Sequence, residues 1–438
     1  MHRVHSNPLA RRLLTIALIE LLCSANYARS EQWPHFRGPT GQGHSQAKHL
    51  PIEWGGPDEK NILWKMPLTG EGHASPIVWD DRIFVCTAHW PDAVASQDQR
   101  KQQIPEHHVL CFRLADGKQL WDTQVEPGSW LRDDFRSGPG GGYAAPTPVT
   151  DGKQVYVVFG SSVIAALDFD GRVVWRQAIE PHNFDVTIGT SPLLFGDTVL
   201  MLCAMRNQRD SSLIAYNRQD GSVSWQKPLP ETGFAHSTPL LIEAAGKPQL
   251  IFAASGIRET NSGVQSLDPR TGDVIWTCRG GGDASSPAYG AGIVYCDNGR
   301  GGPGVAIEPT GTGDVTNSHV KWRIDLVPEG IGSPVIADGL VYRLHRPNVL
   351  KCWQASDGKE VYAQRLDGLS TTWASPIVDA AGRLYVANAG LSYVIQTGRE
   401  YQLLATNDLG DPNHASPAVA GDKLILVGAK SVYCIGAR

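Results

Sequence analysis

Three histidines stand at the same place in a repeated short motif. His73 lies in GHASP (72–76), His414 in NHASP (413–417) and His236 in AHSTP (235–239). An imidazole near neutral pH can move a proton, hydrogen-bond a ligand or coordinate a metal ion. A metal site would need its ligands within about 2 Å of one ion. We assign no metal site and expect the three histidines to be hydrogen bonded or to face a ligand.

A second group of candidates lies in polar segments between short apolar runs. Its members are Trp373, Arg206, Arg258, Arg300, His345 and Asn388. Arginine forks onto carboxylates and phosphates, and indole rings among arginines are typical of recognition surfaces. Two interpretations stay open for these residues: a solvated polar rim, or a funnel that binds an anion or another polar ligand. No residue is assigned a catalytic role.

Prolines preceded by small residues recur along the chain and define a repeat. They are Pro76, Pro148, Pro192, Pro239, Pro287, Pro334, Pro376 and Pro417. Their successive spacings are 72, 44, 47, 48, 47, 42 and 41 residues, and the first spacing contains a polar insertion at 88–108. Each proline opens an apolar run, so we expect it to open the first strand, A, of a unit.

Two further signals repeat in phase with the prolines. Strand B runs such as QVYVVFG (154–160) follow each proline, and strand–turn–strand stretches such as ALDFDGRVVW (166–175) then end in an aromatic residue. Four short strands in a unit of 40–50 residues are the signature of a β-propeller blade. Eight A strands therefore predict an all-β protein, an eight-bladed β-propeller.

The two ends of the chain complement one another. The last unit stops after strand C at 430–438, whereas NILWKMPL (61–68) is a D strand with no A, B or C before it. We expect residues 61–68 to complete the last blade and close the ring, which removes open sheet edges. The two HASP motifs would then lie on neighbouring blades, and His236 would lie across the ring.

The strand–turn–strand stretches resemble the pyrroloquinoline-quinone (PQQ)-like repeat. The cleanest copy runs from Leu267-Asp268 through Thr271-Gly272 to Trp276, and the resemblance covers residues 61–438. Such propellers occur in quinoprotein alcohol dehydrogenases, in the scaffold lipoprotein of outer-membrane assembly and in exported bacterial proteins. The segment WPHFRGPTGQG (33–43) resembles the last group. The resemblance implies that the repeat tryptophans pack between blades: Trp64, Trp121, Trp175, Trp225, Trp276 and Trp322.

The same resemblance implies PQQ with calcium as a possible cofactor. The residues that bind this cofactor in the family can be compared with those of this chain. The dehydrogenases of the family carry an adjacent Cys-Cys pair, which this chain lacks. Those dehydrogenases also place an aromatic ring under the quinone, and Trp373 could serve as that ring. Their calcium ligands are Glu, Asn and Asp, and the residues available by type are Asp185, Glu259, Asp283, Asn298 and Asn388, although no motif assigns them.

The N-terminus resembles an export signal. Arg3, Arg11 and Arg12 precede the apolar run LLTIALI (13–19), and small residues follow at 24–30. We expect residues 1–30 to be a signal peptide and residues 31–60 an N-terminal extension before the propeller at 61–438. The large residues before Cys23 are a poor context for a lipid anchor, and no other apolar stretch is long enough to span a membrane.

Charge and cysteine content exclude some function classes. The formal net charge is −5, and removal of the basic segment 1–30 makes it about −8, so bulk electrostatics does not favour nucleic acid. The seven remaining cysteines show no Cys-x-x-Cys motif. Cys86 and Cys111 flank the insertion and could pair, which the sequence does not decide.

From these observations we expect a monomeric, periplasmic or secreted binding or scaffold protein. Its ligand would be a protein, a peptide or a small polar molecule on the loop-rich face, with no nucleic acid partner. The alternative is a PQQ-dependent oxidoreductase with a divergent site. A hydrolase or lyase remains open as well, since catalytic residues of a propeller lie far apart in sequence.

Overall fold

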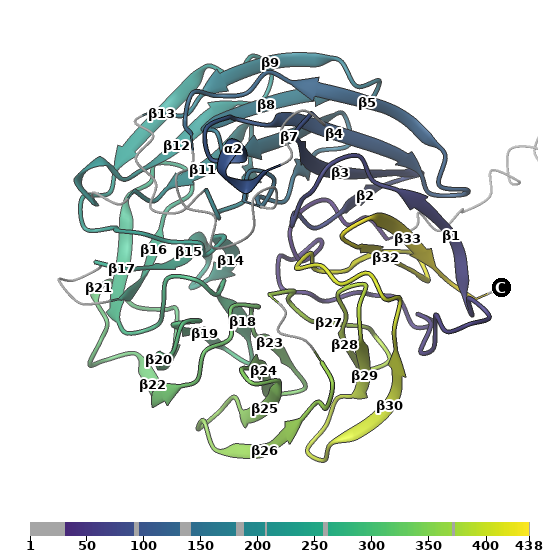
Figure 1. Cartoon of the computed structure of the whole chain (residues 1–438). Coiled ribbons are helices and arrows are strands. Elements are labelled where there is room, and N and C mark those ends of the chain that lie inside the picture. The colour runs from purple at the N-terminus through teal and green to yellow at the C-terminus, as the bar shows by residue number, and fades with distance from the viewer. Residues whose placement is uncertain are drawn as a thin grey trace, which may run out of the picture.

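The computed structural model describes residues 31–91, 96–131, 142–180, 188–205, 208–256, 262–369 and 373–437. Within these ranges the chain forms a ring of eight antiparallel sheets. Figure 1 shows the sheets arranged as blades around a central hub, with the first strand, in purple, beside the last, in yellow. The predicted eight-bladed all-β propeller is therefore confirmed.

The first four blades follow one another along the chain. Blade 1 contains β2 (Ile77–Trp79), β3 (Arg82–His89), β4 (Glu106–Arg113) and β5 (Gln119–Val125). Blade 2 contains β6 (Val149–Thr150), β7 (Gln154–Phe159), β8 (Val163–Asp168) and β9 (Val173–Ala178). Blade 3 contains β10 (Leu193–Phe195), β11 (Thr198–Cys203), β12 (Ser212–Asn217) and β13 (Val223–Pro228). Blade 4 contains β14 (Leu240–Ala244), β15 (Lys247–Ala254), β16 (Gly263–Leu267) and β17 (Val274–Arg279).

The remaining blades complete the ring. Blade 5 contains β18 (Ala288–Gly290), β19 (Ile293–Asp297), β20 (Gly302–Ile307) and β22 (Val320–Val327). Blade 6 contains β23 (Val335–Ala337), β24 (Leu340–His345), β25 (Val349–Gln354) and β26 (Glu360–Arg365). Blade 7 contains β27 (Ile377–Val378), β28 (Arg383–Val386), β29 (Ser392–Gln396) and β30 (Gln402–Asn407). Blade 8 contains β31 (Ala418–Ala420), β32 (Lys423–Val427), β33 (Ser431–Ile435) and β1 (Ile62–Pro67).

Short pieces outside this pattern occupy the connections. The helix α2 (Gln97–Arg100) and the 3-10 helix η1 (Gln208–Asp210) lie in loops. The strand β21 (Gly313–Asp314) pairs in parallel with β17 and extends the sheet of blade 4. The stretched repeat at 313–322 is therefore divided between two sheets. Its first residues, in β21, pair with blade 4, and its last residues begin β22 of blade 5. No helix among the described residues is long and apolar enough to cross a membrane.

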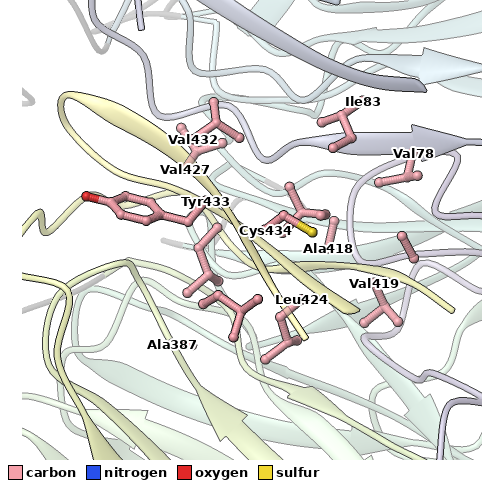
Figure 2. Close-up of a cluster of buried hydrophobic side chains, with 14 of the residues drawn as sticks. Val78, Ile83, Ala387, Ala418, Val419, Leu424, Val427, Val432, Tyr433 and Cys434 are labelled. Atoms are coloured by element: carbon pink, nitrogen blue, oxygen red, sulfur yellow. The ribbon is translucent and has the colours of Figure 1, made fainter. Parts of the chain in front are cut away.

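The first strand closes the ring as the sequence predicts. β1 pairs antiparallel with β33, with Trp64 opposite Cys434 and Met66 opposite Val432. Each A strand begins directly after its proline, where the missing N–H costs no ladder hydrogen bond. Figure 2 shows the core at this closure, where side chains of blade 8 such as Val419 and Tyr433 share one cluster with Val78 and Ile83 of blade 1.

Four of the six repeat tryptophans bond the C–D turn of the next blade: Trp64, Trp121, Trp175 and Trp322. The Trp276 indole donates instead to Gln249 of its own blade. The indole N–H of Trp121 donates to the Phe169 carbonyl at 2.9 Å, and that of Trp175 to the Arg218 carbonyl at 2.8 Å, each in the next blade. The sequence analysis expected each tryptophan to end its D strand, and this expectation is wrong. Trp175 is the third residue of β9, because only the start of strand D lies beside the next blade's turn.

Residues 31–54 run across the hub on one face of the ring. Trp33, fully buried, exchanges backbone hydrogen bonds with Val78 of blade 1. Further along, the carbonyls of Lys48 and Ile52 accept hydrogen bonds from Arg383 and Asn407 of blade 7. Between these contacts, Arg37 donates to the Pro287 carbonyl of blade 5, so the segment ties blades on opposite sides of the hub to one another. Residues 1–30, with the expected signal peptide and Cys23, lie outside the described residues.

Candidate functional site

A ring of eight hydroxyl groups surrounds the hub. The residue before each A-strand proline is a serine or threonine, and its backbone N–H donates to the hydroxyl of the next blade's equivalent at 2.9–3.1 Å. The members of this hydroxyl ring are Ser75, Thr147, Ser191, Thr238, Ser286, Ser333, Ser375 and Ser416. The bond from Ser416 N–H to Ser75 Oγ, at 3.0 Å, joins the two HASP motifs and closes the circle.

The hydroxyl ring surrounds the base of a central cavity of about 540 Å³. That volume lies within the roughly 300–1,000 Å³ typical of small-molecule sites. Phe36 lines this cavity and also a second one, of about 370 Å³, formed with the N-terminal segment. Phe36 therefore separates the two cavities at the hub.

The three histidines of the repeated motif all line the central cavity, as expected from their phase. His73 and His414 contact one another edge to face with ring centroids 4.9 Å apart. Trp373 stacks on His414 at 4.6 Å with an interplanar angle of 18°. His236 lies on blade 4 and contacts Phe234. The cavity thus has an imidazole–indole wall on blades 7, 8 and 1.

Asn413 orients the imidazole pair, and the sequence analysis missed it. Its amide N–H groups donate to the carbonyls of Gly72 and Gly428, both at 2.9 Å. Its Oδ1 is therefore the acceptor for His73, which donates from Nδ1–H at 2.6 Å. A neutral His73 then carries its lone pair on Nε2. The His414 ring accepts at Nδ1 from the Trp373 backbone N–H at 3.4 Å.

Burial controls the protonation of His414. Burial, aided by the neighbouring His73 and Arg346, lowers the pKa of His414 to about 4. His414 is therefore a neutral hydrogen-bonding group at physiological pH rather than a cation.

Charged side chains line the cavity on blades 5 and 6, next to blade 7. Arg300 lines the cavity, lies 4.7 Å over the Phe234 ring and reaches Asp283 at 3.5 Å. Arg346 and Glu329 also line it and pair at 2.9 Å. Arg346 belongs to a polar loop of the sequence, but nothing in the sequence singled out Glu329 as a partner.

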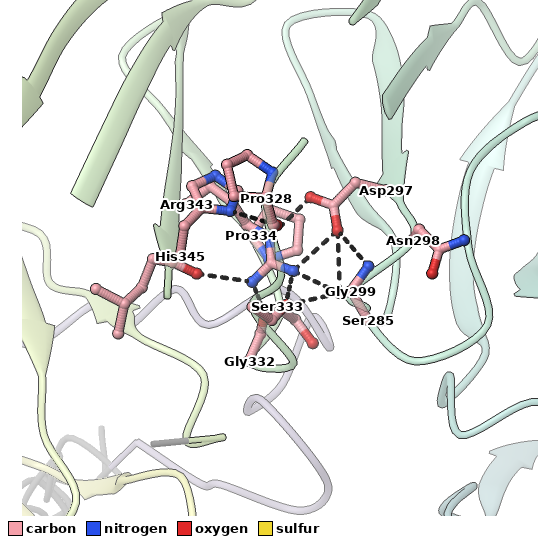
Figure 3. A network of polar contacts seen from close by, with 12 residues as sticks. Ser285, Asp297, Asn298, Gly299, Pro328, Gly332, Ser333, Pro334, Arg343 and His345 are labelled. Carbon is pink, nitrogen blue, oxygen red and sulfur yellow. Dashed lines mark hydrogen bonds and ion pairs between the residues drawn. The ribbon is translucent and has the colours of Figure 1, made fainter. Parts of the chain in front are cut away.

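A buried ion pair fixes this wall. Arg343 Nε donates to Asp297 Oδ2 at 2.7 Å, and both side chains are fully buried. Burial alone would raise the pKa of Asp297, but the charge and hydrogen bonds of Arg343 outweigh it and hold the pKa low. Figure 3 shows that Arg343 also bonds Ser285 and Gly332, so it clamps the segment that carries Ser333.

Two predicted site residues lie away from the cavity wall. His345 is buried, bonds the Pro328 carbonyl at 3.0 Å and packs against Trp353. Asn388 is also buried. Its side chain accepts from Gly390 N–H, and its carbonyl accepts from Asn413 N–H at 3.0 Å. Asn388 therefore fixes the backbone position of Asn413. Arg206 and Arg258 lie outside the described residues.

The described residues do not form the quinone and calcium site that the family's dehydrogenases require. Trp373 has one face covered by His414. Asp283 is paired with Arg300, the Asn298 side chain accepts from the Arg300 N–H, and Asn388 is buried in its own turn. Asp185 and Glu259 lie outside the described residues. No three His, Cys, Asp or Glu side chains gather as a metal-ligand group in the described part of the chain.

The cysteines do not contribute to the cavity. Cys86, Cys111, Cys203, Cys278, Cys296, Cys352 and Cys434 are buried, and none of these seven forms a disulfide. Burial raises the pKa of Cys111 to about 12. These thiols are therefore apolar core groups of the strands.

Comparison with known proteins places these features in context. A family model described as "Outer membrane protein assembly factor BamB" matches residues 105–314. The protein of that name from Yersinia pestis is 24% identical over 325 residues, which is 70% of this chain and 78% of the relative.

Solved structures share the architecture. BamB from Moraxella catarrhalis superposes with a TM-score of 0.61 at 12% identity, covering 85% of this chain and 99% of that one. A europium-containing methanol dehydrogenase gives a TM-score of 0.67 at 12% identity, covering 92% of this chain and 90% of that one. At these identities the likeness concerns the fold.

Proposed function

We propose that the chain is an exported binding or scaffold protein of the PQQ-like β-propeller type, which the family-model match and the similarity to BamB support. Its ligand, a protein segment, a peptide or a small polar molecule, enters the central cavity from the loop-rich face. The observation that carries the proposal is the cavity itself, to which all eight blades contribute a residue at the same phase.

The composition of the cavity suits recognition. Trp373, His73 and His414 offer flat, partly buried rings, and Arg300 and Arg346 offer guanidinium groups on blades 5 and 6. A cavity with apolar rings and a few oriented polar groups is the general form of a ligand site. The orienting groups are held by the backbone of several blades, so little ordering is required when a ligand binds.

Two of the ionisable side chains that line the cavity have defined partners. Glu329 is paired with Arg346, and the orientation of His73 is set by Asn413. The name of the Yersinia pestis relative, an assembly factor, agrees with a scaffold role.

A binding panel measured by calorimetry and by thermal shift tests the proposal. The panel contains short peptides, small organic acids and PQQ with calcium, applied to the mature chain. We expect saturable binding by a peptide or acid that weakens at least about tenfold in Trp373→Ala and in His73→Ala, since each removes a wall of the cavity. The matched control is His49→Ala, an exposed histidine of the N-terminal segment.

Two outcomes would contradict this function. Equal affinity in the wild type and in both cavity variants would place the ligand elsewhere. Tight PQQ binding that Trp373→Ala abolishes, together with dye reduction by an alcohol or sugar, would favour the oxidoreductase.

A further inference from the structure

Among the described residues, the charged side chains that line the cavity are in one sector, formed by blades 5 and 6. Arg300 and Arg346 line the cavity there, with Asp283 and Glu329 as their partners. Both pairs are partly exposed to solvent, and exposed ion pairs contribute little stability. An incoming anion can therefore take the place of the Glu329 carboxylate at low cost.

A third guanidinium lies beneath this sector. Arg37 of the N-terminal segment is 1% exposed. It donates to the carbonyls of Pro287 at 3.2 Å and Pro334 at 2.5 Å, the residues that directly follow Ser286 and Ser333. Its partners are carbonyl oxygens, and no carboxylate pairs with it among the described residues. Its Nε has no hydrogen-bond partner in that part of the chain.

The electrostatic environment of Arg37 is unfavourable for a cation. Burial, together with the charge of Arg343, lowers the pKa of Arg37 to about 9. The Asp297 carboxylate does not offset this, because it is already paired with Arg343. Three guanidinium groups, of Arg37, Arg300 and Arg346, thus stand against two carboxylates in the described residues of the sector. The imbalance favours a negatively charged occupant.

The hydroxyl ring adds donors at the same place. Ser286 Oγ accepts from Thr238 N–H at 3.0 Å, and Ser333 Oγ accepts from Ser286 N–H at 3.1 Å. Each hydroxyl also carries one proton to donate. Both residues line the cavity, and neither hydroxyl donates to another group among the described residues. Their protons are therefore available to an acceptor in the cavity.

We propose that the blade 5–6 sector is a subsite for an oxyanion, a carboxylate or phosphate group of the ligand. Arg300, Arg346, Ser286 and Ser333 donate to its oxygens, and Arg37 supplies positive charge from below. Arg343 donates to the carbonyls of Gly330 and Gly332 and so holds the segment that carries Glu329 and Ser333, which orients the donors before the ligand arrives. This inference rests on the proposed function, because it names the ligand group that the cavity recognises.

Calorimetry at low ionic strength with three probes tests the subsite: inorganic phosphate, a tripeptide with a free C-terminus, and the same tripeptide as its C-terminal amide. We expect phosphate or the free acid to bind, and the amide to bind at least about tenfold more weakly. Binding should weaken as salt is added. The phosphate and peptide arms distinguish a small anion from a chain terminus as the source of the group.

Variants locate the binding energy. Arg300→Gln and Arg346→Gln should each weaken the anion at least about tenfold. Arg270→Gln, an exposed arginine on the outer C–D turn of blade 4, is the matched control and should leave affinity within about twofold. Because Arg37→Gln could loosen the N-terminal segment, Arg37→Lys, which keeps the charge, is compared with it after far-ultraviolet circular dichroism has established folding.

The outcomes separate the two proposals. Anion affinity unchanged in both Arg300→Gln and Arg346→Gln overturns the subsite. Equal binding of acid and amide, lost in Trp373→Ala, overturns the subsite but supports the binding function. If the folded wild type binds none of the three probes, the subsite is also refuted. The proposed binding function is then tested by the wider panel of ligands described above.

Discussion

Asn413 shows how a single buried amide sets the chemistry of the cavity wall. Its N–H groups bond two carbonyls from different blades, and its Oδ1 accepts from His73 and from the His414 backbone. Each of its hydrogen-bonding groups is therefore used, which is the condition for burying an amide without cost. The arrangement fixes both the seam between blades 8 and 1 and the tautomer of His73.

Asn413→Asp should destabilise the protein by about 2 kcal/mol or more, because a carboxylate oxygen would face two carbonyl oxygens where two N–H groups now donate. Urea unfolding measures the change. Asn217→Asp is the matched control, since its Oδ1 only accepts from Gln219 N–H, as the equivalent Asp168 accepts from Asp170. The control should be nearly neutral, and an equal loss in both variants would contradict the explanation.

Buried neutral histidines should make the fold sensitive to acid. Burial, aided by the Arg343 charge, lowers the pKa of His345 to about 4, and burial lowers that of His107 to about 3. The unfolded chain binds these protons near pH 6.5 and the folded chain does not. The contribution of these neutral histidines to the free energy of unfolding is therefore fully present above about pH 6.5. It is lost as the pH falls towards 4, by up to about 1.4 kcal/mol per pH unit for each histidine.

His345→Gln tests this pH dependence. Glutamine keeps an N–H donor for the Pro328 carbonyl but does not titrate. Urea unfolding from pH 4.5 to 7.5 should show a shallower pH slope for the variant than for the wild type. Parallel slopes would show that His345 does not carry the predicted proton linkage.

At the scale of elements, the contact between strand D of one blade and the C–D turn of the next recurs around the ring. Gly117, Gly171, Gly221 and Gly358 take positive φ in these turns, and a Cβ on any of them would come within 2.5–2.7 Å of the preceding blade's tryptophan. Glycine supplies both the turn conformation and the space for the indole. The repeat tryptophans and turn glycines thus form one interface unit.

Gly171→Ala should therefore cost more than the backbone strain alone. The Cβ would approach Trp121 at 2.7 Å, and overpacking of this kind costs about 1–3 kcal/mol. Gly246→Ala is the control, because Gly246 also has positive φ but nothing lies within 4 Å of its Cβ position. The urea midpoint of unfolding should fall more for Gly171→Ala than for Gly246→Ala. Equal decreases would mean that Trp121 can move away from the added Cβ without a cost in stability.

At the scale of the whole molecule, the hydroxyl ring is a circular set of hydrogen bonds that exists only when all eight blades are in place. It joins every A strand to the next on the inner side, while β1 closes the last sheet on the outer side. The N-terminal segment crosses the hub and bonds several blades, with Phe36 between the two cavities. The cavity is therefore a property of the closed ring.

Ser416→Ala should destabilise the protein by about 1–3 kcal/mol, because it leaves the buried Ser375 N–H without its acceptor. Ser416→Thr should be tolerated better, since threonine holds the same position at Thr147 and Thr238. Thermal and urea unfolding measure both. The interpretation fails if Ala and Thr behave alike, or if Ser356→Ala, an exposed serine, costs as much.

The sequence by itself determined the fold, because the information for it is local and repeated. A proline that opens strand A, a turn glycine and a following tryptophan recur in copy after copy, and each copy has the same energetic requirement to bury its apolar faces. The missing fourth strand of the last unit likewise required its partner at 61–68. The phase of His73, His236 and His414 was sufficient to place all three on the cavity.

Only the tertiary structure decided the partners within the cavity. Asn413 and His73 are 340 residues apart, and Arg37 meets Pro287 and Pro334 from the other end of the chain. Such contacts occur once each, so no period in the sequence reports them. The sequence places His345 and Asn388 in loops at the right phase, but His345 ends β24 and both side chains are buried behind the wall. There each makes a hydrogen bond to a backbone group, which a buried polar side chain requires.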